Sequence, residues 1–248
     1  MRKITVFANF LIDSEERFLR MKDSFESFHR GNIDFWLINV RGIYKKKVHS
    51  FLKKRIKKKK LKISFLNSQE GWMNDTRQLL KFINTKLVFF WTEDHICVSG
   101  IKYFNAVVND MIRHNVEYLQ YSWFIYGLTL KSLNKINHQK TNNIIYLSYD
   151  KNILKKRLLW FKNKNRNNQL EWIISMQSIL TVELFKKIIE SDEFTFFKKN
   201  NPFSFEKNTR HTKWLPYKLG LTKKELFASI DCDHYVKNYS LIYLLERF

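Results

Sequence analysis

Two carboxylates and an imidazole follow closely on a run of five apolar residues. The run is LVFFW (residues 87–91), and Glu93, Asp94 and His95 come after it, separated from it by Thr92. Adjacent carboxylates repel each other, so they are costly together unless a cation or a basic group compensates for their charge. Oxygen ligands with one nitrogen suit Mg²⁺ or Mn²⁺, and such a divalent metal could bridge a diphosphate and stabilise it as a leaving group. The alternative is that Thr92 or Asp94 only caps the next helix.

The elements that would position this cluster are strands and helices in alternation. Apolar runs predict strands at residues 4–12, 33–40, 61–66, 87–91 and 116–124. Amphipathic segments separate these runs, and the first segment begins with Asp13 and Glu16 at the spacing of a capping box. This order is typical of βαβ units, and it predicts an α/β fold with a mainly parallel sheet flanked by helices on both faces.

Residues just beyond the carboxyl ends of the strands are candidates for ligand binding, because open α/β sheets bind their ligands there. The first three predicted strands end near Asn9 and Phe10, Asn39 and Arg41, and Asn67 and Ser68. Polar groups at such positions suit a nucleotide base and its ribose. Each residue could equally be an ordinary turn residue.

Beyond about residue 125 the alternation loosens. We expect a loop at 131–143, strands at 144–148 and 172–180, and a helix at 182–189. Residues 202–234 show no regular pattern, and a closing helix is expected at 240–247. Since no linker or internal repeat divides the chain, residues 1–248 are expected to form a single domain.

Charge and cysteine content bear on the partners and the compartment. The chain carries 45 Lys+Arg against 23 Asp+Glu, a formal net charge of +22. Such an excess indicates an anionic partner (nucleic acid, an acidic membrane or phosphorylated substrates), with compositional drift of a Lys- and Asn-rich sequence as the alternative. Cys97 and Cys232 have neither a disulfide-framework nor a zinc-site spacing, which favours a reducing cytoplasm. Neither a signal peptide nor a membrane-spanning run is expected.

The segment GWMNDTRQLLKFINTKLVFFWTEDH (71–95) resembles the nucleotide-binding part of family-2-like glycosyltransferases of the GT-A fold. In that family a Gly-led helix runs into an apolar strand that ends in an Asp-any-Asp motif. The resemblance implies that Gly71 opens the helix, that Asp75 lies in the nucleotide-sugar site, and that residues 93–95 stand where the acidic motif stands. It covers residues 3–98 well and the rest loosely, and NVRG (39–42) replaces an Asp-rich segment.

The resemblance also implies a division of the chain into a nucleotide-sugar-binding half, about 1–125, and an acceptor-side half, about 126–248. In such enzymes an Asp or His near the C-terminus often closes over the diphosphate and joins the metal shell. Asp233 and His234 could play that part. The alternative is a solvated loop carboxylate beside a surface histidine.

An inverting sugar transfer needs a carboxylate that takes the proton of the acceptor hydroxyl. Glu206, among aromatic neighbours, is the first candidate, and Glu171 is the second. Surface salt bridges are the alternative for both. Trp160, Trp172 and Trp214 could stack on sugar rings or belong to the core.

Residues 45–60 (KKKVHSFLKKRIKKKK) form a basic amphipathic segment, and residues 155–166 form a second basic patch. A basic amphipathic helix suits an anionic membrane surface, and it would also contact the phosphates of RNA or DNA. The third interpretation is a solvated outer helix whose apolar face packs on the sheet.

These features predict a cytoplasmic glycosyltransferase, at most peripheral on the inner face of the membrane. It would move a sugar from a nucleotide diphosphate-sugar to a saccharide or lipid-linked acceptor in surface glycan synthesis, with a divalent metal. The alternatives are a basic nucleic-acid-binding protein, a metal-dependent nuclease that uses the same acidic clusters, and an inert scaffold at the membrane. The sequence contains no P-loop, dinucleotide fingerprint or Gly-flanked nucleophilic serine.

Overall fold

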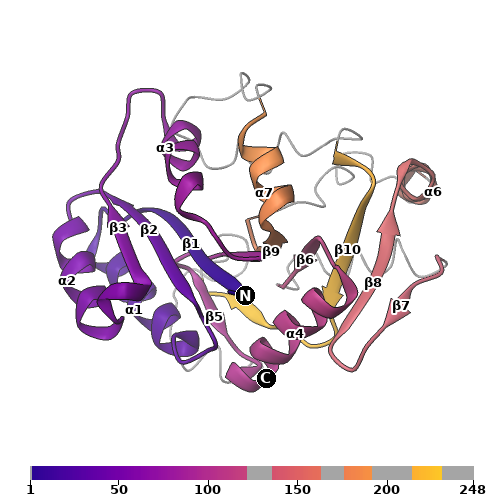
Figure 1. The fold of residues 1–248 in the computed structure, drawn as a ribbon, viewed down its shortest axis with the longest axis horizontal. Helices are drawn as coiled ribbons and strands as arrows, with labels where there is room; N and C mark the ends of the chain where they lie inside the picture. The colour runs from indigo at the N-terminus through magenta and orange to yellow at the C-terminus, as the bar shows by residue number, and fades with distance from the viewer. Residues whose placement is uncertain (1, 122–135, 163–175, 192–213, 231–248) are drawn as a thin grey trace.

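The computed structural model describes residues 2–121, 136–162, 176–191 and 214–230. Its main element is a mixed sheet with the strand order β3-β2-β1-β4-β9-β6-β10-β8-β7 (Figure 1). The strands of this sheet are β1 (Ile4–Leu11), β2 (Phe35–Arg41), β3 (Leu61–Ser64), β4 (Leu87–Phe90), β6 (Tyr118–Gln120), β7 (Gln139–Lys140), β8 (Ile144–Tyr149), β9 (Ser178–Thr181) and β10 (Tyr217–Thr222). A separate two-stranded sheet pairs β5 (His95–Cys97) with β11 (Phe227–Ser229). The helices are α1 (Glu15–Phe28), α2 (Lys45–Arg55), α3 (Trp72–Leu79), α4 (Gly100–His114), α6 (Lys151–Lys162) and α7 (Val182–Ile189), with short 3-10 turns at Lys58–Lys60 and Leu80–Phe82.

The half of the sheet built from the first four strands is parallel. β1 pairs in parallel with β2 and with β4, and β2 pairs in parallel with β3. The register places Asn9 of β1 opposite Asn39 of β2. The carboxyl ends of these strands therefore meet along one edge of the sheet, as the sequence predicts.

The other half contains the antiparallel pairs. β9 lies antiparallel between β4 and β6, while β10 pairs in parallel with β6 and antiparallel with β8. The predicted α/β class is confirmed. The structure also shows that strands from the later part of the chain belong to the same sheet as the first four strands.

Helices cover both faces of the sheet. On one face, alternate β1 residues such as Val6 and Ala8 pack with Phe25 of α1, Leu52 of α2 and Phe104 of α4. On the other face, Phe7, Leu37 and Val88 pack with α3 and α7. This alternation is the two-residue period of a strand that is buried on both sides, and it explains why the first strands read as continuous apolar runs.

Two predictions about irregular segments are wrong. Tyr217–Thr222 and Phe227–Ser229 are strands, although they lie in the segment expected to be irregular, and Gln139–Lys140 is a short strand within the expected loop. Their pairing is long-range: β10 pairs with β6 and β8, and β11 pairs with β5. Local sequence pattern carries little information about such pairing.

The start of α1 also differs from the prediction. Ser14, not Asp13, is the N-cap, and its hydroxyl accepts a hydrogen bond of 3.2 Å from the backbone N–H of Arg17. Asp13 lies one residue outside the cap, with its carboxylate 3.5 Å from Nε of Arg17. The acidic residues of the first turn are Glu15 and Glu16, which suit the positive end of the helix dipole.

Among the described residues, no helix is both long enough and apolar enough to cross a membrane.

Candidate functional site

A pocket of about 270 Å³ lies at the carboxyl ends of β1, β2 and β4. Its walls are Asn9, Phe10, Leu11, Arg17, Arg41, Trp72, Phe90, Trp91, Thr92, Glu93 and Met176. The structure thus brings together four residues that the sequence names as candidates: Asn9, Phe10, Arg41 and Glu93. It is the place where an open α/β sheet binds its ligand.

A network of asparagine side chains holds the pocket edge together. Asn39 donates to Oδ1 of Asn9 at 2.9 Å and exchanges hydrogen bonds of 2.8 and 3.0 Å with the backbone of Leu66. Asn9 in turn donates to the carbonyl of Trp72 and to Thr76. The indole N–H of Trp72 donates back to the carbonyl of Asn9 at 3.1 Å. Asn39 is fully buried, so it positions the strand ends and does not face the pocket.

Arg41, at the end of β2, is a buried cation in the pocket wall. Its side chain is 7% exposed. Burial lowers its pKa below the ordinary value, and the nearby charge of Asp75 opposes that shift. Within the described part of the chain, Nε of Arg41 and Oδ2 of Asp75 are buried without a hydrogen-bond partner. Unpaired buried polar atoms are costly, so a polar group of a ligand bound at this corner would find a donor and an acceptor there.

The loop before α3 positions Asp75 through its backbone. Gly71 is the N-cap residue and has φ = 94°, a left-handed conformation that favours glycine. The backbone N–H of Ser68 donates to Oδ1 of Asp75 at 3.1 Å. Asn67 is exposed. Neither Asn67 nor Ser68 lines the pocket, in contrast to Asn9, Phe10 and Arg41.

Glu93 is the carboxylate of the pocket. It lies 3.9 Å from Nη1 of Arg17, which comes from the first turn of α1. Burial, and then the charge of Asp94, raises the pKa of Glu93 to about 7, while a backbone hydrogen bond and the charges of Arg17 and His95 oppose the shift. A carboxylate that titrates near neutrality can hold or release a proton at physiological pH.

Asp94 and His95 interact with each other. Oδ1 of Asp94 lies 2.7 Å from Nδ1 of His95, and Oγ1 of Thr92 lies 2.8 Å from the same nitrogen. Burial alone would raise the pKa of Asp94, but His95, by its charge and its hydrogen bond, holds it below the ordinary value. His95 is 2% exposed, and its backbone pairs with Ser229.

In this structure the side chains of residues 93–95 do not converge as one ligand set. Nδ1 of His95 already contacts Asp94 and Thr92, and its Nε2 is buried. In the part of the chain that the structure describes, no group of three His, Cys, Asp or Glu side chains is placed to hold a metal ion. Glu93 is the member of the cluster that lines the pocket.

The structure does not bring the remaining candidates into the pocket's description. Glu171, Trp172, Glu206, Asp233 and His234 are outside the described residues, and so is the side chain of Trp160. Trp214 is 3% exposed and belongs to the core that covers the α3 and α7 face, so it is not a platform for a sugar ring.

Sequence reasoning missed Arg17, Trp72 and Trp91 as pocket residues. Arg17 donates from Nη1 to the carbonyl of Leu11 at 3.0 Å, which turns its side chain back over the end of β1. The only sequence signal is its position in the first turn after a strand, four residues after Asp13. Trp91 directly follows β4, and a buried aromatic there reads simply as core.

The mainly parallel sheet with helices on both faces is an α/β fold like that of GT-A-type structures. Solved structures of S. aureus TarS residues 1–349 share it: the complex with UDP gives a TM-score of 0.56 at 11% identity, covering 92% of this chain and 60% of that one. The complex with UDP-GlcNAc gives a TM-score of 0.54 at 12% identity, covering 97% of this chain and 62% of that one. The chain thus spans about 60% of the TarS fragment's length. No protein-family model and no curated protein matches the chain. The likeness does not single out family 2.

Proposed function

We propose that this protein is a nucleotide-sugar-dependent glycosyltransferase that transfers a sugar to a saccharide or lipid-linked acceptor in surface glycan synthesis. The observation that carries the proposal is the pocket in which the buried Arg41 and the half-exposed Arg17 stand beside Glu93 at the strand ends. TarS, which has the same fold, binds UDP and UDP-GlcNAc, so a UDP-sugar is the first donor to test.

The two arginines are the groups that would bind the diphosphate of the donor. Guanidinium groups match phosphate oxygens in pairs, and in a pocket with little water their charge stabilises the negative charge that develops on the leaving diphosphate. Phe10, Trp72 and Trp91 supply apolar walls for the nucleoside. The acceptor base remains a prediction for Glu206 first and Glu171 second.

A divalent metal belongs to the same proposal. Glu93 is the described carboxylate that could contact such an ion, and the predicted partners Asp233 and His234 lie outside the described residues. We therefore assign no step to a metal. The cytoplasmic side of a membrane is the proposed place of the reaction, because both a nucleotide-sugar and a lipid-linked acceptor can be met there.

The proposal is tested by a thermal-shift screen against UDP-, GDP-, CMP- and dTDP-linked sugars, with and without Mn²⁺. A ligand that binds the native state raises the melting temperature by mass action. We expect a rise with one nucleotide class, and a dependence on Mn²⁺ would support a metal site. Absence of any rise would overturn the proposal.

Arg41→Lys tests the role assigned to Arg41. Lysine keeps the charge but loses the planar donor pair, so we expect donor affinity to fall at least about tenfold, with a smaller thermal shift. Arg113→Lys, on the exposed last turn of α4, is the matched control and is expected to bind like the wild type. Equal shifts in all three proteins would mean that Arg41 does not contact the donor.

A further inference from the structure

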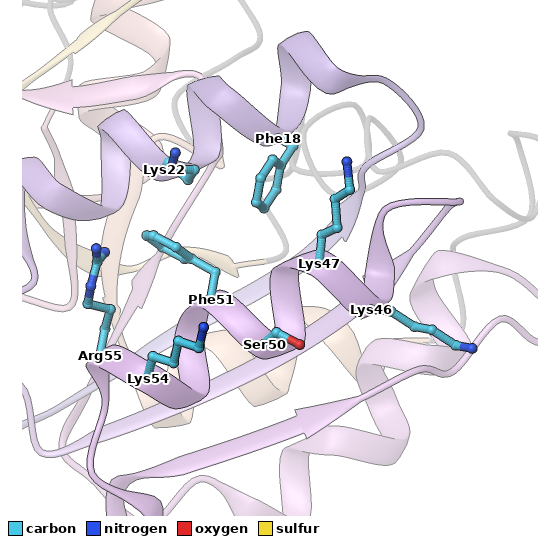
Figure 2. Close-up of a pocket in the computed structure, with 8 residues that line it drawn as sticks. All are labelled: Phe18, Lys22, Lys46, Lys47, Ser50, Phe51, Lys54 and Arg55. Atoms are coloured by element: carbon cyan, nitrogen blue, oxygen red, sulfur yellow. The ribbon is translucent and has the colours of Figure 1, made fainter.

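A basic groove of about 530 Å³ runs between α1 and α2, on the outer side of the sheet's first strands. Figure 2 shows Phe18 of α1 and Phe51 of α2 pointing toward each other between the two helices. The side chains that line the groove are Phe18, Lys22, Lys46, Lys47, Ser50, Phe51, Lys54 and Arg55. They include five cations and no carboxylate.

The floor of this basic groove is apolar. Phe18 and Phe51 pack edge to face, with ring centroids 6.3 Å apart, and both are partly buried against the core. Nζ of Lys22 lies 5.8 Å from the Phe18 centroid and 5.9 Å from the Phe51 centroid. The guanidinium of Arg55 lies 4.6 Å from the Phe51 centroid and also contacts Glu26. Cations are thus held over an apolar surface.

Three lysines of the groove, all on α2, are exposed to solvent. Lys46, Lys47 and Lys54 are exposed, and among the described residues none of them forms an ion pair. The buried residues of α2 are Val48 and Leu52, which anchor the helix on the sheet. The ammonium charges of Lys46, Lys47 and Lys54 are therefore available to a partner.

An exposed aliphatic side chain stands at the start of the same helix. Ile43, in the turn between β2 and α2, is 80% exposed. It follows Arg41 of the pocket by two residues, and Leu11, another pocket residue, is 40% exposed beside this turn. The backbone N–H of Tyr44 donates to the carbonyl of Ile12, which fixes the turn against the end of β1.

We infer that α2 and the basic groove dock on an anionic phospholipid surface. The lysines would contact headgroup phosphates, and Ile43 would enter the interface, a combination typical of peripheral membrane helices. Docking would place the mouth of the pocket at the bilayer, within reach of a lipid-linked acceptor; this last role rests on the proposed function. Nucleic acid fits less well, because the two Phe rings pack on each other and because a duplex offers nothing to Ile43.

Co-sedimentation of the full-length protein with vesicles tests the inference. The vesicles are phosphatidylcholine alone, or phosphatidylcholine with about one third phosphatidylglycerol. We expect binding to the anionic vesicles only, weakened by salt. The triple variant Lys46→Gln, Lys47→Gln, Lys54→Gln is expected to bind on the order of 100-fold more weakly, since each lysine near such a surface contributes a few-fold. Ile43→Asn is expected to weaken binding several-fold without changing its salt dependence.

The control triple variant has the same net charge but different positions: Lys102→Gln, Lys140→Gln and Lys155→Gln, all exposed. It is expected to bind like the wild type, and both triple variants are expected to keep the thermal shift with the donor.

Equal weakening of vesicle binding by both triple variants would overturn the inference. Binding to neutral vesicles alone, or to no vesicles at all, would also overturn it. An RNA or DNA duplex could also bind Lys46, Lys47 and Lys54. If a duplex displaces the protein from anionic vesicles at a concentration below that of the lipid, and the first triple variant no longer binds the duplex, the inference is overturned in favour of nucleic acid. A missing donor shift with intact vesicle binding would reject the proposed function and leave the docking surface standing.

Discussion

Glu93 is the pocket residue whose charge the fold disfavours. Its pKa of about 7, against an ordinary 4.5, means that the folded protein holds the proton more tightly than the unfolded chain. The contribution of Glu93 to the free energy of unfolding is therefore expected to fall as pH rises from about 4.5 to 7, by at most about 3 kcal/mol. Glu93→Gln removes this loss. In urea titrations we expect the wild type and Glu93→Gln to have similar free energies of unfolding near about pH 5. Near about pH 8 we expect the variant to be more stable than the wild type by about 1–3 kcal/mol. A stability difference that does not change with pH would contradict the assignment.

Asn39 and Asn67 provide a matched pair for the positioning role. Asn39→Ala removes three hydrogen bonds and leaves Oδ1 of Asn9 and the backbone of Leu66 without those partners. We expect a loss of about 2–4 kcal/mol in the free energy of unfolding, because these groups stay buried. Asn67→Ala changes an exposed side chain, and we expect less than about 0.5 kcal/mol. Chemical denaturation measures the free energy of unfolding of both variants. Equal losses would contradict the positioning role of Asn39.

At the scale of elements, the cap of α1 matters because this helix carries Arg17 to the pocket. Ser14→Ala removes the hydrogen bond to the backbone N–H of Arg17 and is expected to cost about 1 kcal/mol. Asp13→Ala removes only an exposed ion pair and is expected to cost less than about 0.5 kcal/mol. Thermal denaturation compares the two, and a larger cost for Asp13→Ala would restore the capping box that the sequence suggested.

The elements that the sequence predicts well are those whose burial is visible locally. Strands β1, β2 and β4 are buried on both faces, so each is mostly apolar and the polar residues of β2 stand at its carboxyl end. β10 reads YKLGLT, in which a lysine and a glycine interrupt the pattern. Gly220 is needed there because a Cβ would lie 2.8 Å from Val116 and 2.9 Å from Leu119. That requirement comes from neighbours about a hundred residues earlier.

Some residues of the pocket can also be predicted from the sequence, and others cannot. Asn9, Arg41 and Glu93 are predictable because strand ends share an edge, and that edge follows from the βαβ order alone. Arg17 and Trp72 reach the pocket only through the way α1 and α3 pack on the sheet. The mutual contact of Asp94 and His95 is also invisible in sequence, where the two residues look like members of one ligand set.

At the scale of the whole molecule, the sheet makes one cooperative unit of the described residues. β9 pairs with β4 on one side and β6 on the other, so the early and late parts of the chain share hydrogen bonds. We expect a single unfolding transition, with calorimetric and van't Hoff enthalpies in agreement. Amide exchange in β1, β4, β9 and β6 is expected to occur only by global unfolding. Two resolved transitions would show that the parts unfold independently.

The insertion of β9 also has a consequence for synthesis. Strand β4 is made early, but the edge that β9 covers stays open until residue 181 has left the ribosome. An apolar parallel sheet with an open edge is prone to pair with other chains. The nascent protein therefore passes through a long interval in which its first four strands depend on dilution or on chaperones. Slow translation between residues 90 and 180 would lengthen that interval and lower the yield of soluble protein.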